Sequence, residues 1–536
     1  MPLIISSNSP DNSLAFIKGR IYTVNDHQSC AEAFIVGPDG LFAAIGSTAE
    51  IVAKAQREHL TVHDLKGQFI MPGIHDAHVH LLMSGIASTS QIRLPGEGLN
   101  MSNLADEIKK GQCLCKYAHA NEDWLVGHTY AIDNFDREQL DKDYPDTPVV
   151  IRAGAAHSAY LNTEALRRAG YDVESEPEVQ GAMYFRDPKT GKLTGELAEN
   201  AMNKVATTLP QPRLSHIKRV LREGQHMLHR AGVTSCQEAS ANSLVLHGLR
   251  ELEAEGDLKL DIQTHIVYAP EWVAEEITET LHKLLEEAAD LKSKHIDTRF
   301  VKIILDGVPL APYYTHAGLK DDGKVDESKL FILNLHEAVR VYDGKGMTLK
   351  IHCTGHGSTR LSLDAIEAAR RTNPSGPRHE IAHCSGVHDD EYARFKPLNV
   401  TAEMSPAFFF KHPVTEASGG LMDWNFPKMR AAGAHITIGS DWGAGAEPDI
   451  LPCMGAVVEQ IGDGDKAVGG ERIIRMLTLA GAEAVGRERE VGSIEVGKKA
   501  NFIAVDKDLS RGEFEGASVV TTWFEGEPVY EKPRGS

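Results

Sequence analysis

Short β-like runs alternate with helical segments through the second half of the chain, and this alternation limits the fold more than any other feature. Seven runs stand at 233–237, 262–267, 300–305, 348–352, 380–383, 400–404 and 435–439. An eighth precedes them at 71–80, where His78 and His80 flank Val79 and so point to the same face of a strand. Eight strands separated by helices are what a (β/α)8 TIM barrel requires. The sequence therefore predicts an α/β chain built around such a barrel.

The two ends of the chain share a pattern that differs from that of the barrel region. β-like runs broken by turn residues fill positions 14–70, and similar runs return at 492–506 and 519–524. The simplest arrangement is a small β-sandwich-like domain formed by both termini, from residues 1–70 and 487–536. The barrel would then occupy 71–486. Within it, residues 81–205 are polar and turn-rich, and we expect them to form an insertion after the first barrel strand that covers the active site as a lid.

Composition narrows the class of protein. The 536 residues carry 56 basic and 76 acidic side chains, a net charge of −20 that would repel nucleic acid and anionic membranes. No apolar run approaches the roughly 20 residues needed to span a bilayer. Seven scattered cysteines do not form a disulfide framework, and the first residues lack a secretory signal. These observations favour a cytoplasmic protein with no nucleic-acid or membrane partner.

Polar side chains stand at the ends of the predicted barrel strands, where the chemistry of this fold is carried. Lys302 interrupts an otherwise apolar run, and imidazole or carboxylate groups close several others. Neutral imidazoles and carboxylates are ligands for Zn²⁺, and a catalytic site keeps a position open for water. The predicted metal set comprises His78, His80, Lys302, His352, His383 and Asp441. Cys353 and Cys384 have the opposite parity, so we expect them to pack rather than bind.

In these motifs the chain resembles the metal-dependent amidohydrolase superfamily. The pattern is Pro-Gly-x-x-Asp-x-His-x-His at 72–80, Lys302, His352, His383 and Gly-Ser-Asp at 439–441. The segments 152–159, 194–199, 301–307 and 492–498 resemble the N-substituted formamide deformylase-like branch. The resemblance implies one metal ion held by His78, His80 and Asp441. It implies a second on His352 and His383, a carboxylated Lys302 between them, and Asp441 and Lys302 as the catalytic residues.

Two positions depart from the pattern of that branch. His356 stands where an Asp is common, four residues after His352, and Asn501 stands where an Asp follows Gly-Lys-x-Ala. Asn501 falls in the predicted β-domain and does not affect the site. His356 falls near the predicted metals, so the resemblance leaves the specificity and the ligand set open there.

Several interpretations stay open at this point. His157 and Glu196, in the insertion, are candidates for substrate binding or for local cap and turn roles. Phe409 and Trp424, in the region after the seventh strand, either line a pocket or pack within the loop. Lys302 should face the barrel interior, where burial lowers the pKa of an amine toward the neutral form that reacts with CO₂. The alternative for Lys302 is pairing with a carboxylate, and Lys350 is its rival because it shares parity with His352.

The predicted function is hydrolysis of the C–N bond of a small N-formyl or N-acyl compound, with one or two Zn²⁺ ions or other divalent metals. A second hypothesis is hydrolysis of a cyclic amide, ester or carbamate by the same groups. A third, because one fold hosts unrelated functions, is a catalytically silent scaffold, which would have no need of the ligands. The expected partner is a small-molecule amide, and assembly as a homodimer is left open.

Overall fold

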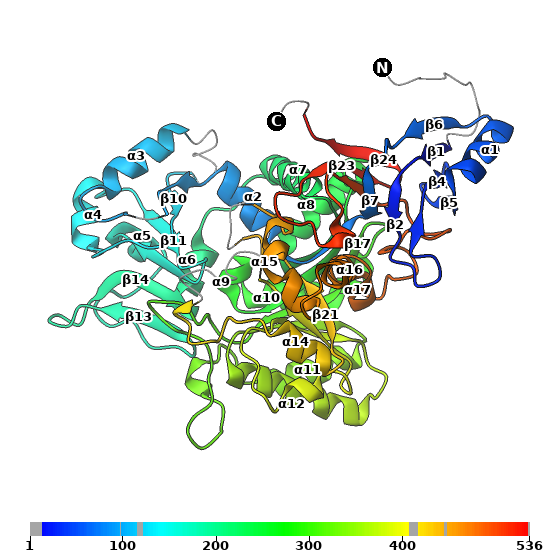
Figure 1. Cartoon of the computed structure of the whole chain (residues 1–536). Coiled ribbons are helices and arrows are strands. Elements are labelled where there is room, and N and C mark those ends of the chain that lie inside the picture. The colour runs from blue at the N-terminus through cyan, green and yellow to red at the C-terminus, as the bar shows by residue number, and fades with distance from the viewer. Residues whose placement is uncertain (1–12, 97, 115–121, 407–415, 444–446, 534–536) are drawn as a thin grey trace.

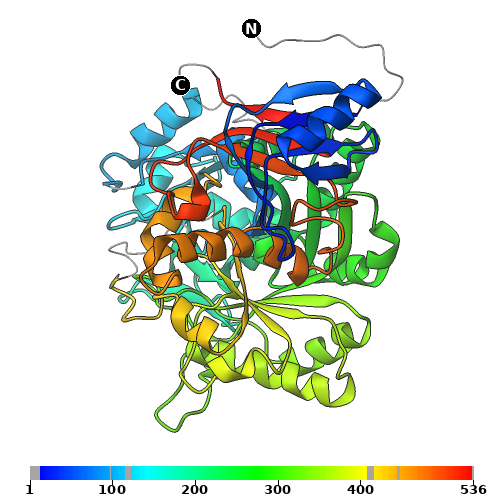
Figure 2. The same ribbon diagram turned by 45° about the vertical axis from the view of Figure 1, so that its right-hand side comes forward.

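A computed structural model describes residues 13–96, 98–114, 122–406, 416–443 and 447–533. Eight parallel strands form one sheet in the order β21-β20-β19-β18-β17-β16-β15-β8. Its last members meet through a parallel bridge between Val79 and Trp442, so the sheet closes into the predicted barrel (Figures 1 and 2). The strands are β8 Ile74–Val79, β15 Val233–Ala241, β16 Asp261–Ala269, β17 Ile296–Ile304, β18 Thr348–Cys353, β19 His379–His383, β20 Val400–Met404 and β21 His435–Ile438.

Helices cover the outside of the barrel and supply its main apolar core. One of them, α7, Leu214–Arg230, buries Ile217, Val220, Leu221 and Leu228 and packs against α2, Leu81–Thr89, and α8, Ser243–Ala254. Gly232 follows with φ of 82°, a left-handed conformation that glycine adopts readily at the end of a helix. No helix within the described ranges is long and apolar enough to cross a membrane.

The predicted β-sandwich-like domain is present, and both ends of the chain build it. One sheet has four strands in the order β5-β4-β1-β6, and the other has six in the order β24-β23-β22-β7-β2-β3. Strand β22, Phe502–Val505, pairs with β7, Phe69–Pro72, which joins the two termini directly. Aromatic rings fill the space between the sheets, where Trp523 stacks on Phe502 at a centroid distance of 4.5 Å. The other strands are β1 Leu14–Ile17, β2 Arg20–Tyr22, β3 Cys30–Ala31, β4 Ala33–Val36, β5 Phe42–Gly46, β6 Thr61–Asp64, β23 Val519–Phe524 and β24 Glu527–Glu531.

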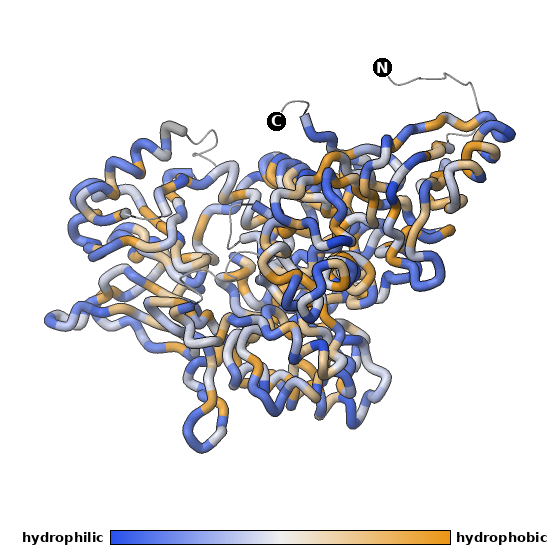
Figure 3. Tube along the Cα trace, in the orientation of Figure 1, coloured by the Kyte–Doolittle hydropathy of each residue, from blue (hydrophilic) through white to orange (hydrophobic). Residues whose placement is uncertain are grey.

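The insertion after the first barrel strand has a sheet and a core of its own. Six strands run in the order β13-β14-β12-β11-β10-β9, so the apolar strand β11 belongs to this sheet and not to the barrel. Figure 1 shows this unit beside the barrel, and Figure 3 shows a hydrophilic tip on its β13–β14 hairpin. The strands are β9 Ile92–Arg93, β10 Leu125–His128, β11 Val149–Ala153, β12 Ser158–Leu161, β13 Ala182–Arg186 and β14 Leu193–Glu199.

Candidate metal centre and active site

The barrel brings together all six side chains of the predicted metal set at the carboxyl ends of its strands. The ring of His383 lies 4.7 Å from that of His78 and 4.4 Å from that of His352, measured between centroids. Asp441 Oδ1 lies 3.5 Å from His80 Nε2 and 3.8 Å from His78 Nε2. Four imidazoles and a carboxylate from the ends of β8, β18, β19 and β21 therefore lie close together.

Outer hydrogen bonds orient the imidazoles of this group. His78 Nδ1 donates to Glu403 Oε2 at 2.7 Å, and His80 Nδ1 bonds to Ser240 Oγ at 2.9 Å. His352 uses the other nitrogen, because its Nε2 bonds to the Gly307 carbonyl at 3.1 Å. A ring held through one nitrogen offers the other to a metal. The nitrogens not used in these outer bonds are Nε2 of His78 and His80 and Nδ1 of His352; the Nε2 atoms of His78 and His80 lie near Lys302 and Asp441.

The protonation states suit a divalent metal. Burial lowers the pKa of the His78 and His352 rings well below the usual value, and that of His383 to about 3, so these imidazoles are neutral. Burial alone would raise the pKa of Asp441, but the hydrogen bond from His80 and the neighbouring His383 lower it, so the carboxylate is charged. Neutral imidazoles with a carboxylate form a donor set that Zn²⁺ accepts.

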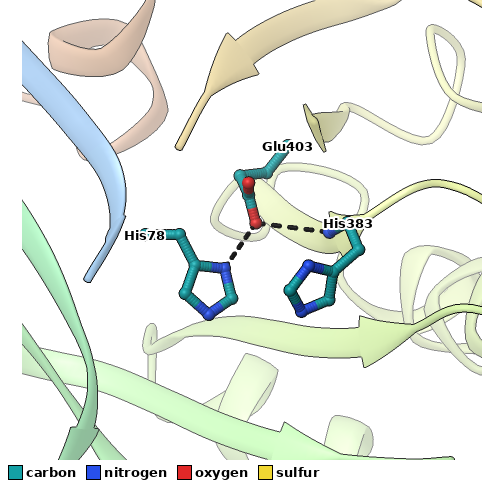
Figure 4. Close-up of side chains that lie close together, drawn as sticks. All are labelled: His78, His383 and Glu403. Carbon is teal, nitrogen blue, oxygen red and sulfur yellow. Dashed lines mark hydrogen bonds and ion pairs between the residues drawn. The ribbon is translucent and has the colours of Figure 1, made fainter. Parts of the chain in front are cut away.

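Glu403, on β20, is a candidate site residue that was not predicted from the sequence. Figure 4 shows its carboxylate between His78 and His383: it accepts the hydrogen bond from His78 Nδ1 and a 3.3 Å hydrogen bond from the His383 backbone N–H. Atoms of these three residues lie close enough to hold an ion. Because the carboxylate contacts the outer nitrogen of His78, we assign it instead to orienting the ligands.

The structure separates the two lysines that compete for the bridging role. Lys350 Nζ donates to Glu380 Oε2 at 3.0 Å and to the Ala77 carbonyl at 2.8 Å, so it is the rival lysine, Lys350, that pairs with a carboxylate. Lys302 Nζ instead lies 3.0 Å from His78 Nε2 and forms no ion pair with any residue that the structure describes. Burial and the nearby Lys350 lower the pKa of Lys302 to about 7. These contacts favour Lys302 as the carbamate-forming residue.

A mostly apolar pocket opens over the metal centre. The insertion contributes Arg152 and His157 to it, and Arg152 forms an ion pair with Glu275. Trp424 also lines the pocket and donates its Nε1–H to the His383 carbonyl at 3.0 Å. The remaining lining residues are His80, Met83, Ala155, Ala156, Trp272, Val273, Lys302, Ile304, Val308, Pro309, Leu310, His352, Thr354, His383, Ser385, Ser405, Met422, Asp441 and Gly443.

Other predicted positions lie elsewhere. Glu196 is not among the residues that line the pocket. Its carboxylate accepts a hydrogen bond from the Tyr313 hydroxyl. Phe409 falls outside the described residues. His356 is the first residue of α12, His356–Thr372, and its ring lies 5.8 Å from that of His388, away from the pocket lining. Asn501 accepts a hydrogen bond from the backbone of Glu525 in the β-domain.

A closed barrel with imidazoles and a carboxylate at its strand ends defines the class of metal-dependent hydrolases. The chain belongs to the amidohydrolase family, whose Amidohydro_3 model matches residues 61–530. It is 25% identical to the N-substituted formamide deformylase of Arthrobacter pascens, over 97% of this chain and 98% of that protein. Two solved structures, described as metal-dependent hydrolases from Pyrococcus furiosus and Pyrococcus horikoshii, share the fold. The Pyrococcus furiosus structure has a TM-score of 0.68 and 21% identity, and the match covers 93% of this chain and 100% of that chain. The Pyrococcus horikoshii structure has a TM-score of 0.70 and 20% identity, and the match covers 93% of this chain and 98% of that chain.

We predict that Glu403→Gln weakens zinc binding about 10- to 100-fold, the usual cost of losing an outer partner of a metal-bound imidazole. The substitution replaces the carboxylate that accepts the hydrogen bond from His78 Nδ1 with an amide of nearly the same size. Chelator competition on the purified protein measures the change. The control is Glu459→Gln, whose exposed carboxylate pairs with Lys466 on the protein surface. Equal zinc affinity in wild type and Glu403→Gln would remove Glu403 from the metal centre.

Proposed function

We propose that the protein cleaves the C–N bond of a small N-formyl or N-acyl compound, using a metal centre formed by His78, His80, Lys302, His352, His383 and Asp441. The observation that carries the proposal is the charged Asp441 carboxylate beside Nε2 of His78 and Nε2 of His80, in an apolar pocket. The similarity to a formamide deformylase over nearly the whole chain supports the substrate class.

The metal ions, Asp441 and Lys302 have different roles in the proposed reaction. One or two Zn²⁺ ions, when bound, would lower the pKa of a water molecule and polarise a carbonyl group. Asp441, held ionised by its neighbours, accepts a proton during attack on the acyl carbon and returns it to the leaving nitrogen, which is general acid–base catalysis. Lys302, as a carbamate, would supply negative charge between the two groups of ligands.

The insertion acts in this proposal as a lid. Arg152, Ala155, Ala156 and His157 come from residues 81–205 yet line the pocket over the barrel strands. The pairing of Arg152 with Glu275 satisfies the charge of the guanidinium, so the pocket suits a neutral substrate with an apolar group. The division into 1–70 with 487–536 and 71–486 stays a prediction. The cytoplasmic setting stays one as well and rests on the cysteine argument.

The alternatives differ in the substrate or in whether there is a reaction at all. A cyclic amide, ester or carbamate would meet the same groups. A silent scaffold would have no need of four histidine rings gathered around the Asp441 carboxylate. Family membership among hydrolases further disfavours the scaffold.

A substrate panel tests the proposal. The zinc-loaded protein is incubated with N-substituted formamides, N-acyl amino acids, lactones and cyclic amides, and released amine and acid are quantified. We expect turnover of at least one formamide or linear N-acyl compound with kcat/KM above that for any lactone. Turnover confined to lactones or cyclic amides would replace the proposed substrate class with the second hypothesis.

A further inference from the structure

A buried hydrogen-bonded chain in the lid ends at the pocket. His157 Nδ1 lies 2.8 Å from Glu199 Oε2. A carboxylate oxygen accepts, so Nδ1–H donates, and Nε2 is the ring atom left for the pocket that His157 lines. Nε2 makes no hydrogen bond to any part of the chain that the structure describes. The His157 ring lies 5.7 Å from that of His352 and 5.2 Å from that of Trp272, directly beside the metal centre.

Glu199 is fixed from the barrel side. Its Oε1 accepts a 2.5 Å hydrogen bond from the Thr315 hydroxyl, which in turn accepts one from the Val308 backbone N–H at 3.0 Å. The Glu199 side chain is almost fully buried, and its backbone has φ of 56° and ψ of −132°, a conformation that a non-glycine residue adopts only when its surroundings impose it.

The crowding around Gly307 shows how closely the His157–Glu199–Thr315 hydrogen bonds lie to the predicted metal ligands. A Cβ there would lie 2.0 Å from Thr315 Oγ1 and 2.3 Å from Glu199 Oε1, so only glycine leaves room for the two groups to meet. The carbonyl of the same residue accepts the hydrogen bond from His352 Nε2. The lid dyad and a predicted metal ligand are therefore positioned by one backbone segment.

We propose that His157 is a further catalytic residue, whose Nε2 hydrogen-bonds to the reacting amide, and that Glu199 and Thr315 are its positioning residues. The proposal rests on the proposed amide hydrolysis. A catalytic imidazole is commonly held in place by a hydrogen bond to a third group, and the Glu199 carboxylate has that place here. The hydrogen bond between Glu199 and Thr315 joins the insertion to the barrel, so the complete site needs both parts of the chain.

The test compares His157→Asn, Glu199→Gln and the matched pair Thr315→Val and Thr315→Ser in the zinc-loaded full chain. Thr315→Val keeps the shape of the side chain and loses the hydroxyl, whereas Thr315→Ser keeps the hydroxyl. We expect kcat to fall about 100-fold in His157→Asn. We expect a fall of about 10-fold or more in Glu199→Gln and Thr315→Val, near wild-type kcat in Thr315→Ser, and unchanged bound zinc and KM throughout.

A purely structural role predicts a different pattern. Thermal midpoint and zinc content would then fall together while kcat per bound zinc stayed at the wild-type value, and that result would overturn the proposal. Binding of acetohydroxamic acid, measured by calorimetry, supplies a readout independent of turnover. Weaker binding in Glu199→Gln and Thr315→Val but not in Thr315→Ser supports the dyad even if the wild type cleaves none of the amides. Equal affinity in all variants contradicts it.

Discussion

Asp441→Asn should lower kcat by about 10³- to 10⁴-fold without unfolding the protein. The amide has nearly the same shape as the carboxylate, but it cannot take up a proton, and general acid–base catalysis contributes up to about 10⁴-fold. The fold should survive because strand-end side chains of a barrel serve the site more than the core. Steady-state kinetics with a substrate from the panel, together with zinc analysis and thermal unfolding, measure the effect.

The matched control is Asp506→Asn, which changes an exposed carboxylate in the β-domain. It should leave kcat and bound zinc as in wild type. If Asp441→Asn kept near wild-type kcat with a full complement of metal, the role assigned to Asp441 would be wrong. The same test on His78→Ala should remove both metal and activity, because that ring offers Nε2 to the centre.

Lys302→Ala should lose metal and activity together, with partial rescue by formate, acetate or propionate. The substitution removes the amine that lies 3.0 Å from His78 Nε2, and a short carboxylate can enter the space and supply the missing negative charge. We expect zinc affinity to fall about 100-fold, as for loss of other groups that support a metal site. Zinc content and kcat are followed as each acid is added. Lys302→Met, which fills the space, should lose metal but gain nothing from the acids.

Lys350→Ala is the comparison that makes this prediction specific. It leaves Glu380 buried without its cation, so we expect a loss of about 3–5 kcal/mol in the free energy of unfolding and no rescue by added acids. Full activity and two bound metals in Lys302→Ala without any acid would exclude the bridge. Loss and rescue confined to Lys350→Ala would move the bridge to that residue.

The barrel and the β-domain were predictable because their signals are local and repeated. Strand runs separated by helices fix the (β/α)8 order, and polar residues that interrupt apolar runs, such as Lys302, mark the strand ends. The helix α1, Thr48–Glu58, was not predicted within the β-domain, although Ser47 and Glu50 form a capping box, which is a sequence signal for the start of a helix. The sheet of the insertion was not predicted, because its strands are short and alternate with turns.

The site was less predictable because its outer contacts join distant segments. Glu403 interrupts an apolar strand in the same way as Lys302, so that signal was present but not used. Ser240 gave no signal at all, since its role depends on the hydrogen bond from His80 and on the one it donates to Glu238. Glu199, rather than Glu196, reaches the pocket-lining His157, a three-residue difference that the geometry of the β14 end decides.

Titration of metal-free protein with zinc tests the central claim most directly. The protein is stripped with a chelator, zinc is added in steps, and bound zinc and release of amine from the best formamide or N-acyl substrate are measured in the same samples. The account predicts no turnover without metal and activity that rises with zinc and saturates at one or two ions per chain. Full turnover by the metal-free protein, or saturated zinc binding with no hydrolysis of any amide in the panel, would contradict it.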